Sequence, residues 1–178
     1  MPTYNRSSLS FEEGEGAYLF DSKGKKYLDF MSGIAVSSLG HSHPKLIAEL
    51  KKAIEKPWHV SNLFTIVDQT KLANKLVENC FAESVFFTNS GAEALECLIK
   101  VVRKYFYHIN QSDRFRIITF EGAFHGRTLA TLAAGGKKNH LEGFGPVVDG
   151  FDQIPFGDFE KAKEIINNSS AAFLIEPI

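Results

Sequence analysis

The sequence predicts an α/β fold with a mostly parallel sheet and helices on both faces. Residues 85–88, 116–120 and 171–175 are short apolar runs of the kind that form buried strands. Between them, apolar residues recur at helical spacing in residues 94–107 and 159–166. Strands that alternate with helices in this way are typical of a doubly wound sheet with parallel strands.

The first part of the chain predicts a hairpin and two helices. Residues 17–20 and 26–30 are short extended runs on either side of a turn segment that contains Gly24. A helix is expected from Pro44, because proline is well tolerated at the first helical position. Apolar residues at helical spacing within 73–80 indicate the next helix.

The second part supplies the strands and helices of the sheet. In residues 94–107, Leu95, Ile99 and Phe106 share one helical face, which we expect to pack on the sheet. Asp158 is the expected N-cap of the last helix. The sequence ends directly after the last strand, and an unpaired edge there would be unfavourable. We therefore expect the chain to be incomplete, as part of a longer protein.

Composition and charge exclude several classes of protein. Hydrophobic residues make up 44% and charged residues 23% of the 178 residues, and the formal net charge is -1. These values favour a globular protein and give no reason to expect a nucleic-acid or membrane partner. The N-terminus lacks the pattern of a signal peptide, and Cys80 and Cys97 lie in helical patterns as expected of reduced, buried thiols. We predict a cytoplasmic protein.

A first candidate site lies where Asn89-Ser-Gly-Ala-Glu-Ala94 joins the run 85–88 to the following helix. Gly91 would let the chain turn sharply and let a ligand approach the backbone. Free N–H groups at the start of the helix would attract an anion such as a phosphate. The alternative is an ordinary capping box, with Ser90 as N-cap and Glu93 three residues later.

A second candidate site is Gly122-Ala-Phe-His-Gly-Arg-Thr128, directly after the strand 116–120. Ligands bind at the carboxyl ends of parallel strands, so Phe124 could present its ring to a heteroaromatic ligand. Arg127 has a planar fork suited to a substrate carboxylate. The alternatives are a core phenylalanine and a solvated arginine.

Other titratable residues are weaker candidates. His41, His43 and His125 have no neighbouring carboxylate motif, so a metal site is not expected, and a capping role in a loop is the better interpretation for the first two. Glu176 follows the last strand and is the carboxylate that we most expect to face a site.

Seven stretches in order resemble one family, the class-III aminotransferases that depend on pyridoxal phosphate, and most closely those that act on N-acetylornithine. The matching stretches are Tyr27-Leu-Asp-Phe30, Ser32-Gly-Ile-Ala-Val36, Leu39-Gly-His-Ser-His-Pro44, His59-Val-Ser-Asn-Leu-Phe64, Phe86-Phe-Thr-Asn-Ser-Gly-Ala-Glu-Ala94, Phe124-His-Gly-Arg-Thr128 and Ile175-Glu-Pro177. One departure is Leu95, where the family usually has asparagine; we interpret it as repacking of an apolar helix face.

The resemblance implies the fold-type-I architecture of the aspartate aminotransferase superfamily and a homodimer. Residues 1–56 would contribute to the small domain, and residues 57–178 would form an incomplete large domain that binds the cofactor. The resemblance also implies that Ser90, Gly91 and Ala92 hold the phosphate of pyridoxal 5'-phosphate. Phe124 would stack on its ring, and Arg127 would bind the substrate carboxylate.

The implied reaction transfers the δ-amino group of N-acetylornithine to 2-oxoglutarate, in arginine biosynthesis. The family's catalytic lysine, the aspartate that pairs with the ring nitrogen and a threonine from the partner subunit would lie beyond Ile178, so no catalytic residue is expected in this chain. Alternative substrates are ornithine, succinyldiaminopimelate and 4-aminobutyrate. A glutamate-1-semialdehyde aminomutase and a non-catalytic module with the same fold are further alternatives.

Overall fold

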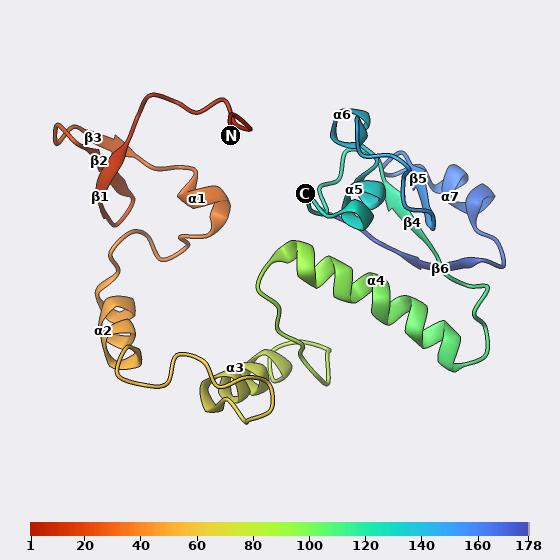
Figure 1. The fold of residues 1–178 in the computed structure, drawn as a ribbon, viewed down its shortest axis with the longest axis horizontal. Helices are drawn as coiled ribbons and strands as arrows, with labels where there is room; N and C mark the ends of the chain where they lie inside the picture. Colours follow the sequence, from red (N-terminus) through yellow and green to blue (C-terminus); the bar gives the residue numbers. More distant parts are fainter. Residues whose placement is uncertain (178) are drawn as a thin grey trace. The chain divides into compact units, whose positions relative to one another are not determined.

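The computed structural model describes residues 1–177 (Figure 1). The chain divides into two compact units, Met1–Glu78 and Asn79–Ile178. Each unit has its own sheet and its own internal contacts. The assignment of residues 1–56 to a small domain and residues 57–178 to a large domain of the complete protein stays a prediction.

The first unit begins with a three-stranded antiparallel sheet in the order β1-β2-β3. Its strands are β1 (Phe11–Glu15), β2 (Tyr18–Asp21) and β3 (Lys26–Leu28). The hairpin of β2 and β3 confirms the prediction, with Gly24 in the turn at a φ of 73°. The Asp21 carboxylate accepts two backbone N–H groups of the turn, which fixes its shape. Strand β1 was not predicted.

After the hairpin the chain forms a left-handed turn, labelled α1 (Ser32–Ala35). All four of its residues have positive φ, including the β-branched Ile34 at 63°, a conformation that L-residues disfavour. The Asp29 carboxylate holds the turn by accepting the N–H groups of Met31 and Ser32. It also pairs with His41 Nε2 at 2.7 Å, and that hydrogen bond is the main reason why the pKa of Asp29 lies below its usual range. His41 therefore has a carboxylate partner that the sequence did not indicate.

Two helices complete the first unit, α2 (Pro44–Ala53) and α3 (Val67–Val77). Both were predicted, although α3 begins and ends earlier than the pattern within residues 73–80 indicated. Cys80 consequently lies after the helix and is exposed, so its predicted burial was wrong. Cys97 is partly buried, and both thiols are free.

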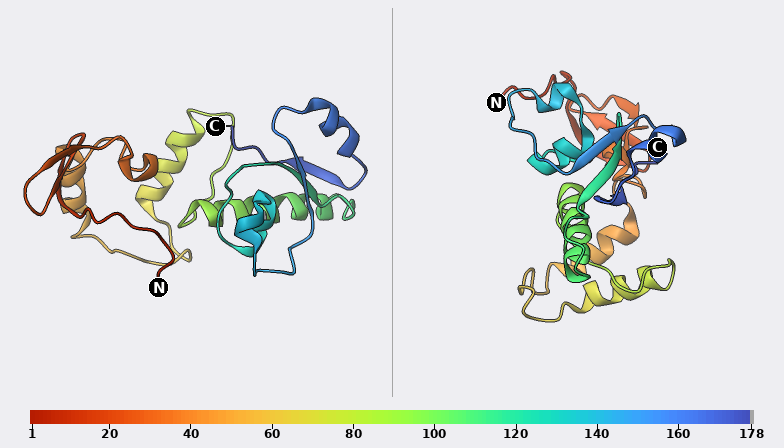
Figure 2. Two further views of the ribbon diagram at one scale, coloured as in Figure 1. Left: turned by 90° about the horizontal axis from the view of Figure 1, so that it is seen from above. Right: turned by 90° about the vertical axis from the view of Figure 1, so that its right-hand side faces the viewer.

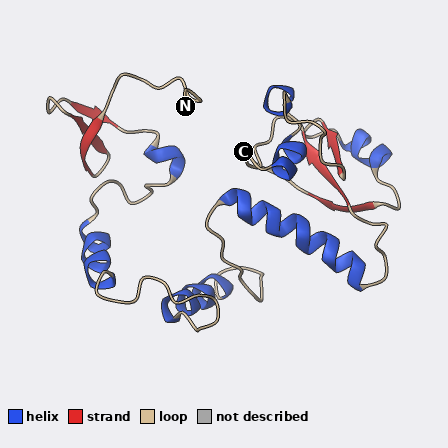
Figure 3. Ribbon diagram, in the orientation of Figure 1, coloured by secondary structure: helices blue, strands red, loops and turns tan. Residues whose placement is uncertain are grey.

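The second unit contains a parallel sheet in the order β5-β4-β6 (Figure 3). The strands are β4 (Arg116–Phe120), β5 (Phe151–Ile154) and β6 (Ser170–Phe173). The predicted strand 116–120 has the observed bounds, and the predicted strand 171–175 is shifted towards the N-terminus by one to two residues. Strand β5 was missed, because only four residues carry it and two of them are polar.

The predicted strand 85–88 is not formed. These residues are irregular, and Phe86 is 75% exposed. A strand exists only through hydrogen bonds to a neighbouring strand. No strand among residues 1–177 lies beside this segment. These β-prone residues therefore have no strand with which to form hydrogen bonds.

Helices cover both faces of the parallel sheet. Helix α4 (Gly91–His108) packs on β6 and touches α5 (Leu129–Gly135), which packs on β4 and β5. From the central strand β4 the chain crosses to β5 at one edge of the sheet. From β5 it crosses in the opposite direction, past β4, to β6 at the other edge. Right-handed crossovers then place α7 (Phe159–Ile165) on the opposite face from α5, as Figure 2 shows. Asp158 caps α7 as predicted. The short α6 (Lys138–Leu141) follows α5.

The core of this unit lies between α4, α5 and the strands. It is formed by Ile99, Ile117, Ala134 and Leu174, which are at most 7% exposed. Leu95 packs against this cluster. This contact is consistent with its interpretation as part of the apolar face of the helix. None of the described helices is both long and apolar enough to cross a membrane.

Candidate cofactor and substrate site

The start of α4 carries a helix cap formed by its own side chains. Ser90 is the N-cap, and its Oγ accepts the backbone N–H of Glu93 at 3.2 Å. The Glu93 carboxylate accepts the N–H of Asn89 at 2.6 Å, so it reaches one residue further back than a standard capping box does. The capping interpretation of this segment is therefore correct in its first half, and it still leaves backbone donors unused.

The unused donors belong to Gly91 and Ala92. Within residues 1–177, neither N–H group has a hydrogen-bond acceptor. Gly91 is helical and not in a left-handed conformation, so the turn itself does not require glycine, contrary to the prediction. A Cβ placed on Gly91 would meet no atom within 4 Å. Two free donors at the positive end of an 18-residue helix can bind an anion.

The segment of residues 122–128 lies directly against the start of α4. Gly126 has a φ of 131°, and a Cβ there would lie 2.9 Å from Ala92 Cβ and 2.8 Å from Thr131 Oγ1. Two residues later, the Thr128 hydroxyl donates to Glu96 Oε1 at 2.5 Å. The fold thus joins two motifs that the sequence presented separately. Thr128 also caps α5, a role that the spacing of Thr128 and Thr131 could have indicated.

Phe124 and Arg127 both face outward from this segment. The Phe124 side chain is 49% exposed, which rules out the core alternative. The guanidinium carbon of Arg127 lies 5.6 Å from the centre of the Phe124 ring, within the range of a cation–π contact. Arg127 also lines a hollow of about 430 Å³, together with Leu132, His140 and Phe144. An exposed aromatic face and a cationic fork are therefore adjacent.

Glu176 meets this segment from the end of β6. Its Oε2 accepts the backbone N–H of Phe124 at 2.8 Å, so this carboxylate contacts the second candidate segment. His125 is 6% exposed, and its Nε2 has no hydrogen-bond partner. Burial lowers the pKa of His125, and the negative charge of Glu176 opposes the change, so the imidazole is neutral at pH 7. Among residues 1–177, no three His, Cys, Asp or Glu side chains gather as metal ligands.

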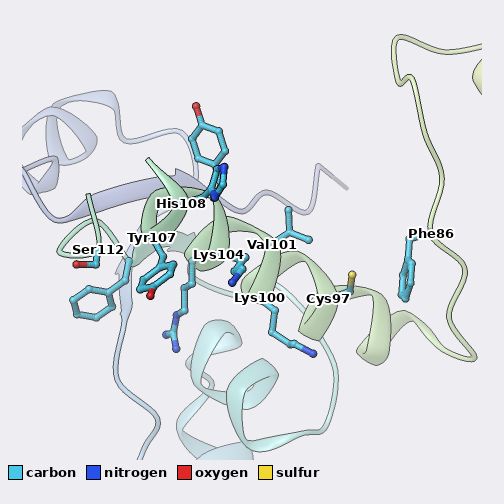
Figure 4. A pocket seen from close by; sticks show the side chains of 11 residues that line it. Phe86, Cys97, Lys100, Val101, Lys104, Tyr107, His108 and Ser112 are labelled. Carbon is cyan, nitrogen blue, oxygen red and sulfur yellow. The ribbon is translucent and has the colours of Figure 1, made fainter. Parts of the chain in front are cut away.

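A large hollow of about 1150 Å³ lies elsewhere, along the side of α4 that faces away from the core (Figure 4). Its walls are mostly apolar, with Phe86, Val101 and Tyr107 strongly exposed. Lys100 and Lys104 project from the same side of the helix. None of the predicted site residues lines this hollow, so its size alone does not connect it with the chemistry at the start of α4.

The residues present fit pyridoxal phosphate. The free donors of Gly91 and Ala92 match a phosphate group, and the open space at Gly91 gives it room. The exposed ring of Phe124 matches a flat heteroaromatic ring. The contact of Gly126 with Ala92 brings the two kinds of group into the same region.

Comparison with known proteins identifies the family of the chain. The class-III aminotransferase family model matches residues 2–178. The chain is 60% identical to acetylornithine aminotransferase of Agrobacterium fabrum over 176 residues, which are 99% of this chain and 44% of the relative. It is 49% identical to acetylornithine aminotransferase of Rhodobacter capsulatus, over 100% of this chain and 45% of that protein. The chain thus spans less than half the length of these relatives.

Solved transaminase structures share the fold. Ornithine aminotransferase of Toxoplasma gondii superimposes with a TM-score of 0.91 at 28% identity, over 100% of this chain and 43% of that protein. An (S)-enantioselective omega-transaminase from Thermomicrobium roseum gives a TM-score of 0.89 at 27% identity, over 100% and 47% of the respective chains. These structures have the fold-type-I architecture, and pyridoxal phosphate is the cofactor that the family implies. The chain belongs to the class-III aminotransferase family.

Proposed function

We propose that the complete protein transfers the δ-amino group of N-acetylornithine to 2-oxoglutarate with pyridoxal 5'-phosphate as cofactor, in arginine biosynthesis. The observation that carries the proposal is the contact of Gly126 with Ala92, which places the segment bearing the exposed Phe124 beside the start of α4 and its free donors. The 60% identity to an acetylornithine aminotransferase supports the choice of substrate.

Each residue of the site then has a role in binding. Gly91 and Ala92 donate their N–H groups to the cofactor phosphate. The Ser90 hydroxyl, whose oxygen already accepts the N–H of Glu93, can still donate its proton to the phosphate. Phe124 packs on the cofactor ring, and Arg127 binds the substrate carboxylate through its fork. When bound, the cofactor supplies an electron sink for the carbanion formed at the substrate carbon.

We assign no catalytic residue to these 178 residues. The lysine that bonds to the cofactor and the aspartate that pairs with the ring nitrogen belong, in this proposal, to the part of the protein that follows. Residues 1–56 join the small domain and residues 57–178 the large domain. The complete protein is a cytoplasmic homodimer that uses small-molecule substrates. Light scattering of the complete protein tests the dimer.

Ornithine is the main alternative donor, because the Toxoplasma ornithine aminotransferase shares the fold with a TM-score of 0.91. Its identity of 28% is far below the 60% found with acetylornithine aminotransferase. Arg127 suits any donor that carries a carboxylate, so it does not separate the two. The acetylated donor is therefore favoured by overall similarity and not by one residue.

Donor competition tests the substrate. The complete protein, loaded with cofactor, is given 2-oxoglutarate and in turn N-acetylornithine, ornithine, succinyldiaminopimelate and 4-aminobutyrate, and glutamate is measured. We expect the highest kcat/KM with N-acetylornithine. A higher value with another donor would reassign the substrate, and conversion of glutamate-1-semialdehyde without 2-oxoglutarate would indicate an isomerase.

Cofactor attachment tests the enzyme class separately. Borohydride reduction should fix the cofactor to the complete protein as a stable adduct, detected by mass spectrometry. A complete protein that gives no adduct would support the non-catalytic alternative. The 178-residue chain alone is expected to transfer no amino group, because it lacks the attachment lysine of the proposal.

A further inference from the structure

Glu176 connects two parts of the chain that are far apart in sequence. Its Oε2 lies 2.8 Å from the backbone nitrogen of Phe124, 52 residues earlier. Glu176 lies three residues after the end of β6, in a stretch whose first residue, Leu174, still donates its N–H to Ile118 O of the central strand β4. Because a hydrogen bond to a charged acceptor is short and strong, the carboxylate can hold the backbone of residue 124 in place.

Among the contacts that attach the segment bearing Phe124 to the fold, three reach α4 or the residues after β6. Thr128 bonds to Glu96, and Gly126 packs on Ala92. These two contacts lie on the C-terminal side of Phe124, and its own N–H takes part in neither. The residues on either side of it, Ala123 and His125, are buried. Glu176 supplies the third contact, at the N–H of Phe124 itself. Of the three, this bond acts most directly on the direction in which the ring points.

The ring has little other support. Phe124 is 49% exposed, and the contact recorded for its ring is the one with the Arg127 guanidinium. Stacking on a ligand costs the entropy of ordering both the backbone and the side chain. A backbone that is already fixed leaves only the side-chain rotamer to be ordered, which lowers that cost. We propose that Glu176 is a positioning residue that sets the orientation of the Phe124 ring against the cofactor; this inference rests on the proposed function.

Two variants at position 176 separate the effect of losing the negative charge from the effect of losing the hydrogen-bond acceptor. Glu176→Gln keeps an oxygen acceptor of the same reach, whereas Glu176→Ala removes the bond. We expect Glu176→Ala to weaken cofactor binding about 2- to 10-fold, less than or equal to the loss from removing an aromatic contact. Glu176→Gln should retain most of the affinity. The visible circular dichroism of the bound cofactor should fall in the same order, since it reports the asymmetry of the ring's surroundings.

A double-mutant cycle with Phe124→Leu tests whether Glu176 acts through Phe124. If it does, Glu176→Ala lowers cofactor affinity in the wild-type background and changes it by less than about 1.5-fold in the Phe124→Leu background. Equal losses in both backgrounds, or no loss in either, would overturn the proposal. Hydrogen exchange at the Phe124 amide, measured without cofactor, should be faster in Glu176→Ala.

Glu121→Ala is the matched control, because Glu121 lines the same hollow of about 270 Å³ as Glu176 and its side chain has no hydrogen bond in the described residues. Its cofactor affinity and dichroism should equal those of the wild type. A wild-type complete protein that binds no cofactor would overturn the proposed function and this inference together. Normal binding with an unchanged Glu176→Ala variant would overturn the inference alone.

Discussion

Gly126 lies so close to Ala92 that a side chain at position 126 would collide with it, at 2.9 Å from Ala92 Cβ. This contact brings the segment that carries Phe124 and Arg127 against the helix end that has free N–H groups. Gly91, one residue before Ala92, is in the opposite situation, because a Cβ there would meet nothing within 4 Å. The two glycines therefore serve different purposes, and substitution distinguishes them.

Gly126→Ala should destabilise the complete protein without cofactor by about 1–3 kcal/mol, because a φ of 131° is strained for alanine and the added carbon overpacks the contact. The melting temperature of the apo-protein measures this loss. An unchanged melting temperature would show that the segment can move away from α4 without cost.

Gly91→Ala should leave the apo-protein as stable as the wild type or raise its stability by about 0.4–1 kcal/mol, since a helical conformation suits alanine. Its added carbon occupies the space expected for the phosphate. Cofactor affinity should fall about 10- to 150-fold, as for loss of a hydrogen bond to a charged group. Full affinity in equilibrium titration would mean that the phosphate binds elsewhere.

Phe124→Leu should weaken cofactor binding about 2- to 13-fold, which is the share of an aromatic contact beyond its area. Fluorescence titration of the apo-protein measures the affinity. Phe159→Leu is the control, because Phe159 is 77% exposed at the start of α7 on the opposite face of the sheet from α5. Equal losses in both variants would argue against a specific role for Phe124.

Arg127→Ala should lower kcat/KM for N-acetylornithine about 10- to 150-fold, because a charged hydrogen bond to the substrate carboxylate is lost. The kcat/KM of Arg127→Lys should lie between those of the wild type and Arg127→Ala, since lysine keeps the charge but not the planar guanidinium fork. Steady-state kinetics with the complete enzyme provide the values. If Arg127→Ala changed only cofactor affinity, the cation–π contact with Phe124 would be its main role.

Acid should destabilise the protein through His125. Burial lowers the pKa of His125 below its ordinary value of 6.5, so the unfolded chain binds the proton more readily. The stability that the neutral imidazole contributes is fully present above pH 6.5 and is lost as the pH falls towards the lower folded-state pKa. His125→Leu should reduce this loss in melting curves recorded from about pH 5 to 8. An identical pH dependence in both proteins would contradict it.

Local patterns in the sequence predicted those elements that depend on neighbouring residues. The hairpin around Gly24, the apolar face of α4 and the Asp158 cap follow from turn chemistry, helical periodicity and capping, and all three are present. The strand 116–120 also has the predicted bounds. The candidate segments 89–94 and 122–128 were found because polar and glycine-containing turns follow apolar runs.

Contacts between distant residues were decided by the tertiary structure. Residues 85–88 have the composition of a strand but no strand beside them among residues 1–177, and Ile34 adopts a left-handed turn that its side chain disfavours. The bond from Phe124 to Glu176 and the contact of Gly126 with Ala92 join residues that no periodicity relates. Composition and spacing report what a segment prefers by itself, whereas these features depend on which segment the fold places beside it.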